Sequence, residues 1–471
     1  MTEQKILIAG EWRDGSESIV VKAPFSSEEI VSVASANEEE VLSSINAADE
    51  GAILMRRLSR YEKGQGLRKI AAGIEARKDE FARTIALESA KPMIYARGEV
   101  ERAISTFSFA AGEAERFVGD VLPIDAQANG GGKTGYSLRV PLGVIYGITP
   151  FNFPLNLVAH KVAPALAAGN SIIIKPSPRT PITALLLGQV FVESGLPEFA
   201  LQIVPADVKY IDAVLDDDRV RMISFTGSAA VGWDLKARAA KKHAALELGG
   251  NAPVIVDETA DDEMSMQRTV TGAFAYSGQV CISVQRIYVH ESKFDAWSKE
   301  FARRASDLKT GDPLDDETQF SVMIDDAAAE RAASWITEAI DGGAMALCEG
   351  DRNGSFLAPH VLTNTDPEMR VVAEEAFAPV AVVEPFSRFE EAVELANLGK
   401  YGLQAGVFTR DLLNARHAAE NLNFGGVLIN DAPIFRTDNM PYGGTKESGF
   451  GREGVRFAME EMSERRVIVS E

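Results

Sequence analysis

Cys281 is one of two cysteines in the chain, and its surroundings favour a chemical role. It ends the segment Ser-Gly-Gln-Val-Cys, which follows a predicted helical run over residues 270–276, and Gly278 gives the backbone freedom there. A cysteine attacks carbon as its thiolate, so a nucleophilic Cys281 needs a polar or electropositive setting. The alternative is a small buried hydrophobic residue, which is the commoner role of an isolated cysteine.

Glu247 is a second candidate for chemistry, in the segment Leu-Glu-Leu-Gly-Gly-Asn at residues 246–251. An acid between two leucines before a Gly-Gly turn has two interpretations. It is a partly desolvated carboxylate with a raised pKa, suited to act as a general base. Alternatively, it is a glutamate on an edge strand that faces water. The spacing favours neither.

Asn152 lies in Thr-Pro-Phe-Asn-Phe-Pro at residues 149–154, directly after a predicted strand. Prolines on both sides favour an extended backbone. An amide group fixed there could donate a hydrogen bond to a developing oxyanion. Alternatively, the asparagine only caps the next helix.

Two further segments indicate nucleotide binding. Lys175 follows a predicted strand, at the crevice where doubly wound folds bind nucleotides. Gly227 and Ser228 form a predicted strand-to-helix turn, whose free N–H groups suit a phosphate. The common Gly-x-Gly-x-x-Gly fingerprint is absent. The residues alone therefore indicate a nucleotide-binding α/β enzyme with a candidate cysteine nucleophile.

The elements that must position these residues alternate between strand and helix. Thr180 and Pro181 are predicted as N-cap and first residue of one helix. Short links between such elements predict a parallel, doubly wound sheet. The predicted strands cover residues 144–146, 171–174, 201–204 and 220–225, with a helix over 155–168 and a second α/β block over 250–450.

The segments outside these two blocks are different in kind. Residues 5–22 predict a hairpin around Gly10, and helices dominate residues 37–117, where Asn37 and Glu40 form a predicted capping box. A polar insertion over residues 122–139 and a final strand over 465–469 predict a small third sheet.

Composition excludes several classes of protein. A net charge of −21 argues against nucleic acid or an anionic membrane surface as the main partner. The start at Met1 has no apolar leader, and no run of about 20 apolar residues would span a membrane. Two cysteines make no disulfide framework, and the five histidines lack metal-ligand spacing. We expect a cytoplasmic protein without a metal.

Together the motifs resemble the aldehyde dehydrogenase superfamily over nearly the whole chain. The resemblance implies two doubly wound domains and a small β oligomerisation arm, assembled as a homodimer or homotetramer. It places the dinucleotide-binding domain at residues 1–118 and 143–248, the catalytic domain at 249–452, and the arm at 119–142 and 453–471. The motifs lie, in family order, at residues 150–154, 169–177, 225–228, 246–250, 278–281, 374–379 and 441–444.

The same resemblance implies a role for each matching residue. Cys281 attacks the aldehyde, Asn152 and the Cys281 backbone N–H hold the oxyanion, and hydride passes to nicotinamide. Glu247 activates the water that hydrolyses the thioester, and Lys161 assists proton transfer. Lys175 and Glu375 hold ribose hydroxyls, Ser228 contacts pyrophosphate, and Phe377 packs near nicotinamide. The implied cofactor contacts are Thr149, Phe151, Lys175, Ser177, Gly227, Ser228, Glu375 and Phe377.

The chain departs from the family pattern at several positions. Ala378 replaces the usual glycine of Phe-Gly-Pro, and Phe151 replaces a frequent tryptophan. Many NAD-preferring members carry a glutamate three residues beyond Lys175, where this chain has Pro178, followed by Arg179. The repulsion of a 2′-phosphate is therefore gone, and both NAD and NADP stay open.

The substrate is the least determined feature. The segments around 150–160 and 281–286 resemble members that act on lactaldehyde, glyceraldehyde 3-phosphate and similar small polar aldehydes. Arg102 and Arg436 fall where such members place arginines that bind anions. Alternatively, each forms a structural ion pair, in which Arg436 would contact a nearby acid such as Asp438 or Glu447. Members specific for phospho- or phosphono-aldehydes often carry an arginine where this chain has Val280, so a strongly anionic substrate is less well supported.

Three rival functions make different demands on the residues. A CoA-acylating dehydrogenase needs no activated water and typically lacks a glutamate at Glu247. A cysteine esterase without cofactor would not need Lys175 or Glu375. A structural protein recruited from this fold would be free to lose Cys281.

Overall fold

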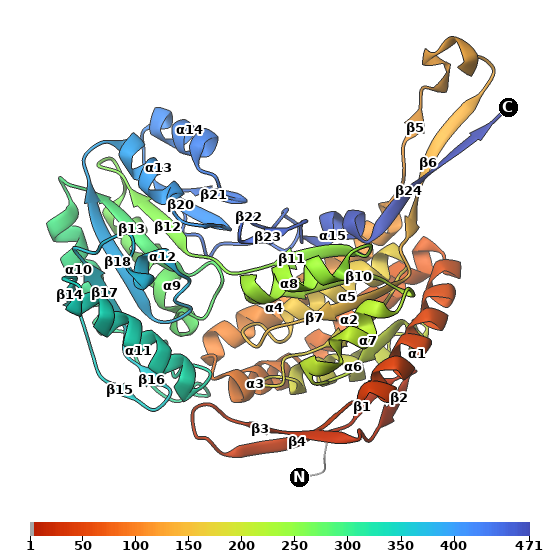
Figure 1. The fold of residues 1–471 in the computed structure, drawn as a ribbon, viewed down its shortest axis with the longest axis horizontal. Coiled ribbons are helices and arrows are strands. Elements are labelled where there is room, and N and C mark those ends of the chain that lie inside the picture. The colour runs from red at the N-terminus through yellow and green to blue at the C-terminus, as the bar shows by residue number, and fades with distance from the viewer. Residues whose placement is uncertain (1–3) are drawn as a thin grey trace.

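Two α/β lobes and a thin projecting arm make up the molecule (Figure 1). The structure is a computed structural model that describes residues 4–471. Residues 1–3, which include the predicted leaderless start and the beginning of the predicted first domain, lie outside this range. Among the described residues, no helix is long and apolar enough to cross a bilayer.

The first lobe is built on an eight-stranded sheet in the order β2-β1-β9-β8-β7-β10-β11-β23. The five central strands, β9, β8, β7, β10 and β11, run parallel, and antiparallel strands lie at both edges. The predicted parallel, doubly wound α/β fold is confirmed, as is the hairpin around Gly10. The strands are β1 (Ile6–Ile8), β2 (Glu11–Arg13), β7 (Val144–Ile148), β8 (Ser171–Lys175), β9 (Leu201–Ile203), β10 (Val220–Thr226), β11 (His243–Glu247) and β23 (Gly449–Phe450).

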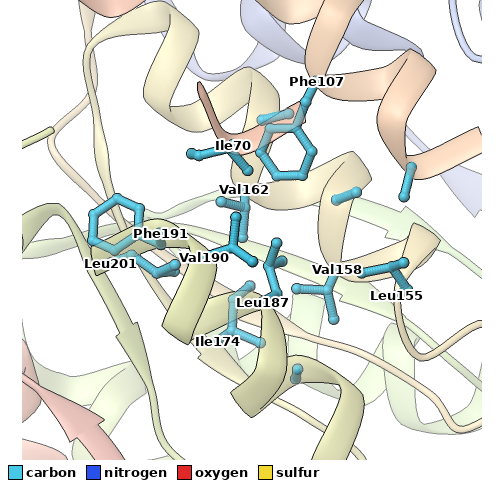
Figure 2. Packing of buried hydrophobic residues seen from close by; sticks show 14 of the residues in the cluster. Ile70, Phe107, Leu155, Val158, Val162, Ile174, Leu187, Val190, Phe191 and Leu201 are labelled. Atoms are coloured by element: carbon cyan, nitrogen blue, oxygen red, sulfur yellow. The ribbon is translucent and has the colours of Figure 1, made fainter. Parts of the chain in front are cut away.

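Helices cover this sheet, and their buried faces form the largest core. Ile70 of α2, Phe107 of α4, Val162 of α5 and Leu187 of α6 meet above Ile174 of β8 (Figure 2). The predicted capping box is present: Asn37 Oδ1 accepts from Glu40 N at 2.9 Å, and the Glu40 carboxylate accepts from Asn37 N at 2.8 Å. The helices are α1 (Glu38–Arg57), α2 (Arg60–Ala76), α3 (Lys78–Ser89), α4 (Met93–Arg116), α5 (Asn156–Ala168), α6 (Ile182–Val192), α7 (Ile211–Asp216) and α8 (Ala229–Ala239).

The start of α6 differs from the prediction. Pro181, rather than Thr180, is the N-cap residue, and the helix begins at Ile182. The carboxylate of Glu88 accepts hydrogen bonds from the N–H groups of Ile182 and Thr183. A buried acid from α3 therefore satisfies the free helix donors that a side-chain N-cap would have taken.

The second lobe contains a seven-stranded sheet in the order β14-β17-β18-β13-β12-β20-β21. All its pairs are parallel except β14 with β17. Its strands are β12 (Ala252–Val256), β13 (Val284–His290), β14 (Met345–Cys348), β17 (His360–Thr363), β18 (Val380–Phe386), β20 (Gln404–Phe408) and β21 (Gly426–Ile429). Its helices are α9 (Asp262–Phe274), α10 (Phe294–Ser306), α11 (Asp326–Asp341), α12 (Arg370–Ala373), α13 (Phe389–Asn397) and α14 (Leu412–Asn421).

A third, three-stranded sheet forms the arm, in the order β24-β6-β5. It joins β5 (Val121–Leu122), β6 (Thr134–Pro141) and β24 (Ser463–Ser470), and Arg465 lies opposite Arg139. The prediction that two distant segments share a small sheet is confirmed. Figure 1 shows the arm extending away from both lobes with the C-terminus on it.

Some residues pack differently from the predicted boundaries. Helix α15 (Val455–Glu461), grouped with the arm in the prediction, buries Val455 and Met459 in the core of the first lobe. Strand β23, grouped with the second block, pairs with β11 of the first sheet. The remaining short pairs are β3 (Glu17–Lys22) with β4 (Glu29–Ser35), β15 (Arg352–Asn353) with β16 (Phe356–Leu357), and β19 (Tyr401–Gly402) with β22 (Thr445–Lys446).

Candidate active site

Four neighbouring strands of the first sheet end at the same edge. Ile148 of β7 lies opposite both Lys175 of β8 and Phe225 of β10, and Thr226 of β10 lies opposite Glu247 of β11. Because these strands are parallel, the residues that follow them meet outside their carboxyl ends. The sheet therefore brings together the predicted residues Thr149, Asn152, Lys175, Gly227, Ser228 and Glu247.

The loop that carries Cys281 turns sharply. Tyr276, Ser277 and Gly278 have φ values of +51°, +54° and +70°, in the left-handed region that non-glycine residues rarely adopt. A Cβ at Gly278 would overlap the carbonyl oxygen of Ala378, so only glycine fits there. The Ser277 hydroxyl donates to the Ser321 carbonyl at 2.7 Å. Packing therefore holds a strained turn directly before the cysteine.

Two glycines, Gly249 and Gly250, allow the segments that hold Glu247, Cys281 and Glu375 to approach one another. A Cβ on Gly250 would overlap the carbonyl oxygen of Cys281, and a Cβ on Gly249 would overlap the carboxylate of Glu375. The Gly250 N–H donates to Glu375 Oε1 at 2.9 Å. The Gly-Gly turn after Glu247 thus allows the Cys281 loop and Glu375 to pack against the end of β11.

A cavity of about 230 Å³ lies between the two lobes beside this turn. It is lined by Cys281 and Glu247, by the predicted substrate residues Arg102 and Arg436, and by Tyr442. Aromatic and apolar side chains, including Phe153, Tyr276 and Ile434, complete its walls. Both predicted arginines therefore face the same space as the predicted nucleophile and base.

Cys281 is partly exposed to this cavity, and its Sγ lies 3.2 Å from the Tyr442 hydroxyl. Burial raises the pKa of Cys281 to about 12, and the hydrogen bond from Tyr442 opposes that rise. The alternative of a cysteine sealed in a hydrophobic core does not describe its position. The other cysteine, Cys348, does lie in such a core.

Glu247 is only 4% exposed, and its Oε2 has no hydrogen-bond partner among the described residues. Burial, followed by repulsion from Glu453, raises its pKa well above the ordinary value, while Arg436 and Lys161 oppose the rise. Strand β11 is paired on both sides, so Glu247 does not face water from a sheet edge. It has the desolvated environment of a general base.

Asn152 is buried, and its Nδ2 donates to the backbone carbonyl of Gln279 at 3.0 Å. Its amide therefore lies against the loop two residues before Cys281. It does not cap α5, because Glu99 Oε1 accepts from Leu155 N at 2.9 Å and from Asn156 N at 3.1 Å. The capping alternative for Asn152 is wrong.

Lys161 belongs to a buried ionic group behind Glu247. Its Nζ lies 3.2 Å from Glu453 Oε1 and 3.1 Å from Ser224 Oγ, and Arg436 Nη2 lies 3.4 Å from Glu453 Oε2. Although burial opposes the change, Lys161, His160 and Arg436 lower the pKa of Glu453 to about 2. Glu453 is thus a charged carboxylate that holds Lys161 and Arg436. Sequence reasoning gave it no role, and no local pattern around it signals one.

Arg102 and His160 share a different acid. Asp438 Oδ1 lies 2.8 Å from Arg102 Nη2 and 2.8 Å from His160 Nε2. Burial, reinforced by Arg436, lowers the pKa of His160 to about 4, so the imidazole is neutral near pH 7. Both arginines therefore make the ion pairs that the structural alternative expects, but the acid that Arg436 contacts is Glu453 rather than Asp438 or Glu447.

An ion pair between Lys91 and Glu99 is completely buried at another wall of the cavity. The Lys91 ammonium lies 3.6 Å from the ring centre of Phe153 and 4.7 Å from that of Tyr276. Glu99 also binds the first N–H groups of α5. The pair therefore ties the Asn152 segment to the turn before Cys281. The sequence contains no signal for it, because its two residues act through tertiary contacts.

The predicted cofactor residues offer unsatisfied polar groups. Lys175 is buried, yet its ammonium makes no hydrogen bond or ion pair within residues 4–471, and Thr149 Oγ1 has no partner there either. Ser228 is the N-cap of α8 but makes no side-chain cap bond. These groups fit a ligand with hydroxyl and phosphate oxygens. The ring of Phe151 meets that of Phe377 edge to face at 5.9 Å.

Arg179, which follows Pro178 at the position where many NAD-preferring members carry a glutamate, already forms an ion pair. Arg179 Nη2 lies 2.6 Å from Asp325 Oδ2 of the second lobe, and Arg179 N donates to Ser177 Oγ at 3.2 Å. Position 178 itself carries no carboxylate, and the acid beside it, Asp325, is paired with Arg179. Within the described part of the chain, no group of three or more His, Cys, Asp or Glu side chains is arranged to hold a metal.

The fold and cavity define a class of enzyme: an α/β protein that places a thiol and a desolvated carboxylate beside the nucleotide-binding edge of a doubly wound sheet. The chain belongs to the aldehyde dehydrogenase family, whose family model matches residues 12–468. It is therefore an oxidoreductase that acts on aldehydes with NAD or NADP, and solved relatives include both NADP-bound and NAD-dependent enzymes.

Individual relatives cover nearly the whole chain. A 3-sulfolactaldehyde dehydrogenase of Priestia aryabhattai is 38% identical over 465 residues, covering 98% of this chain and 97% of the relative. Aldehyde dehydrogenase 21 of Physcomitrella patens, solved with its product succinate, is 40% identical with a TM-score of 0.97, covering 100% and 98%. Glyceraldehyde-3-phosphate dehydrogenase of Methanocaldococcus jannaschii, solved with NADP, is 37% identical with a TM-score of 0.92, covering 97% and 99%.

Proposed function

We propose that this protein oxidises a small polar aldehyde, bearing a hydroxyl or acidic group, to its carboxylic acid through a thioester on Cys281. The observation that carries the proposal is the shared cavity of Cys281, Glu247 and Arg436. It combines a nucleophile, a base and a cation within about 230 Å³. A small cavity of this kind suits a short substrate.

In the first half of the reaction, the Cys281 thiolate attacks the aldehyde carbon and the carbonyl oxygen becomes an oxyanion. The Asn152 amide has two N–H groups, of which Gln279 O accepts one, so the second is free to donate to that oxygen. Lys175, Ser228 and Glu375 would hold NAD or NADP, and the cofactor would accept the hydride that the thiohemiacetal carbon loses when it becomes a thioester.

In the second half, Glu247 removes a proton from water while that water attacks the thioester carbon. The C–S bond then breaks, the acid leaves, and Cys281 returns as a thiolate. The burial of Glu247 and its unpartnered Oε2 support this role. They also argue against a CoA-acylating enzyme, which needs no activated water.

The charges around the cavity support a substrate with an acidic or strongly polar end. Three buried or partly buried acids, Glu99, Asp438 and Glu453, face four cations: Lys91, Arg102, Arg436 and Lys161. Arg436 Nε is buried without a partner and can still donate a hydrogen bond.

The relatives point in the same direction. Their names and ligands include sulfolactaldehyde and succinate, each of which has an acidic group, and lactaldehyde, which has a hydroxyl group. Val280 lies beside Cys281 where a second cation would strengthen anion binding. We therefore infer a substrate with one acidic or hydroxylated end rather than a doubly charged phosphoryl group.

We also infer that the protein is a homodimer or homotetramer held by the arm. Strand β24 pairs with β6 on one side only, and Val467 is 57% exposed on it. Such an edge is usually covered in a folded protein. We further propose a dinucleotide-binding part (residues 1–118 and 143–248) and a catalytic part (249–452), with β23 and α15 packed onto the former.

A panel of aldehydes crossed with NAD and NADP tests the proposed function. Hydroxylated and acidic aldehydes of about three or four carbons should give the highest kcat/KM, and the product should be the free acid. A preference for long alkyl aldehydes would contradict the substrate class. Formation of an acyl-CoA ester, or ester hydrolysis without reduction of the cofactor as the main activity, would contradict the reaction itself.

A further inference from the structure

Tyr442 lies in the cavity wall between Cys281 and Arg436. Its hydroxyl is 3.2 Å from Cys281 Sγ, and the guanidinium carbon of Arg436 lies 3.6 Å from the centre of its ring. The side chain is 4% exposed, and within residues 4–471 its hydroxyl has no hydrogen-bond partner other than the sulfur. The phenol therefore touches the reacting atom with its hydroxyl and a cation with its face.

We propose that Tyr442 is a catalytic residue, whose hydroxyl donates a hydrogen bond to Cys281 Sγ and stabilises the thiolate that attacks the aldehyde. The proposal rests on the role of Cys281 as nucleophile. The Tyr442 hydroxyl would donate to the sulfur before the aldehyde is oxidised. Arg436, stacked on the ring, withdraws electron density from the phenol and makes its O–H a stronger donor.

Only the Tyr442 hydroxyl can be the donor once the sulfur has lost its proton. Burial raises the pKa of Tyr442 well above its ordinary value, so the phenol keeps its proton at neutral pH. A neutral hydroxyl that faces a thiolate forms a charge-assisted hydrogen bond, which is stronger than a bond between neutral groups.

The groups that face Cys281 explain why such a donor matters. Burial is the largest influence and raises the pKa of the thiol, and Glu375 and Glu247 raise it further. The hydrogen bond from Tyr442 and the charge of Arg436 are the opposing influences. Because the thiolate is the reactive form, losing the larger of these two would make the nucleophile scarcer.

A purely structural role for Tyr442 is the competing explanation, since its ring also forms part of the cavity wall. Tyr442→Phe separates the two. It keeps the ring, its packing and its contact with Arg436, and removes only the oxygen beside the sulfur. Tyr288→Phe is a matched control, because it removes a buried hydroxyl that contacts Arg286 and Leu395 and does not line the cavity.

The test measures alkylation of the full-length protein by iodoacetamide over a range of pH, without aldehyde or cofactor. In this reaction the C–S bond forms at Cys281, the C–I bond breaks, iodide leaves, and the thiol proton passes to buffer. Loss of a charge-assisted bond should slow alkylation of Tyr442→Phe by about ten- to a hundredfold at neutral pH. The pH at which the ultraviolet absorbance of the thiolate appears, with Cys281→Ala as blank, should rise in parallel. Tyr288→Phe should match the wild type in both.

The proposal would be overturned if Tyr442→Phe reacted with iodoacetamide at the wild-type rate and its thiolate absorbance appeared at the wild-type pH. If that variant does not fold, site-specific replacement of Tyr442 by fluorotyrosine tests it instead. This nearly isosteric, more acidic phenol should speed alkylation, whereas an unchanged or slower rate would overturn the proposal. Failure of the proposed function gives a different result: aldehyde turnover would survive in Cys281→Ala, whatever the alkylation rates.

Discussion

The carboxylate of Asp438 accepts a hydrogen bond from Arg102 Nη2 at 2.8 Å, whereas Arg436, two residues before Asp438, contacts Glu453 instead. The two arginines at the cavity are therefore not equivalent. Arg102 is held by an acid that also binds His160. Arg436 is more deeply buried and keeps an unpartnered Nε.

This difference predicts separate effects of the two arginines on substrate choice. Arg436→Ala should lower kcat/KM for an acidic aldehyde by about ten- to a hundredfold relative to propanal, the worth of a hydrogen bond to a charged group. Arg102→Ala should mainly lower the thermal stability and change the ratio between the two substrates much less. The measurement is kcat/KM for both aldehydes on both variants. Equal loss on the two substrates in Arg436→Ala would leave a neutral aldehyde as the better substrate.

The two cysteines should respond oppositely to the same substitution. Cys281→Ala should abolish dehydrogenase turnover without loss of fold or cofactor binding, because one small side chain replaces another. Cys348 lies in the core of the second lobe near Ser306, so Cys348→Ala should keep dehydrogenase turnover and only lower the free energy of unfolding. Steady-state rates, circular dichroism and cofactor titration check this. Substantial turnover in the Cys281 variant would refute the thioester mechanism.

Glu247→Gln should separate the two halves of the reaction. Attack by Cys281 and reduction of the cofactor do not need the base, whereas hydrolysis of the thioester does. Stopped-flow measurement should show a burst of reduced cofactor followed by turnover slowed roughly 10²–10⁴-fold. A near-normal steady-state rate without a burst would mean that Glu247 is not the base.

Glu453 should control the pH at which Glu247 works. Glu247 acts as a carboxylate, so hydrolysis is lost as the pH falls through its pKa, which burial and then Glu453 raise. Glu453→Gln removes one cause of the rise and frees Lys161 and Arg436 to act on Glu247. The acid limb of the hydrolysis rate should therefore move to lower pH, while Glu453→Asp should stay closer to the wild type. An upward shift of the limb in Glu453→Gln would contradict this arrangement.

Removal of β24 should disturb assembly. Deleting residues 463–471 exposes the edge of β6, which already carries the exposed side chains Tyr136 and Leu138. The truncated protein should dissociate or aggregate in light scattering, because an unpaired strand edge promotes association with other chains. A truncated chain with the oligomeric state of the full-length protein would show that the arm does not hold the assembly.

The sequence determined the fold and most of the site because those signals are local. Hydrophobic runs with short links predicted the parallel sheet, and the Asn37–Glu40 cap and the turn at Gly227 follow from neighbouring residues. Seven motifs in family order, among them those that hold Cys281 and Glu247, indicated the family that the family model confirms. The N-cap of α6 was predicted wrongly because its partner, Glu88, lies 94 residues away in the chain.

Tertiary structure alone decided how these groups are charged and paired. Whether Glu247 faces water depends on β23, which reaches β11 from some 200 residues further along the chain. The partner of each arginine, the buried Lys91–Glu99 pair and the contact of Tyr442 with Cys281 join distant segments in the same way. Ionisation depends on burial and on the nearest charges in space. The sequence therefore determined which groups are present, and the fold determined which of them carry charge and act together.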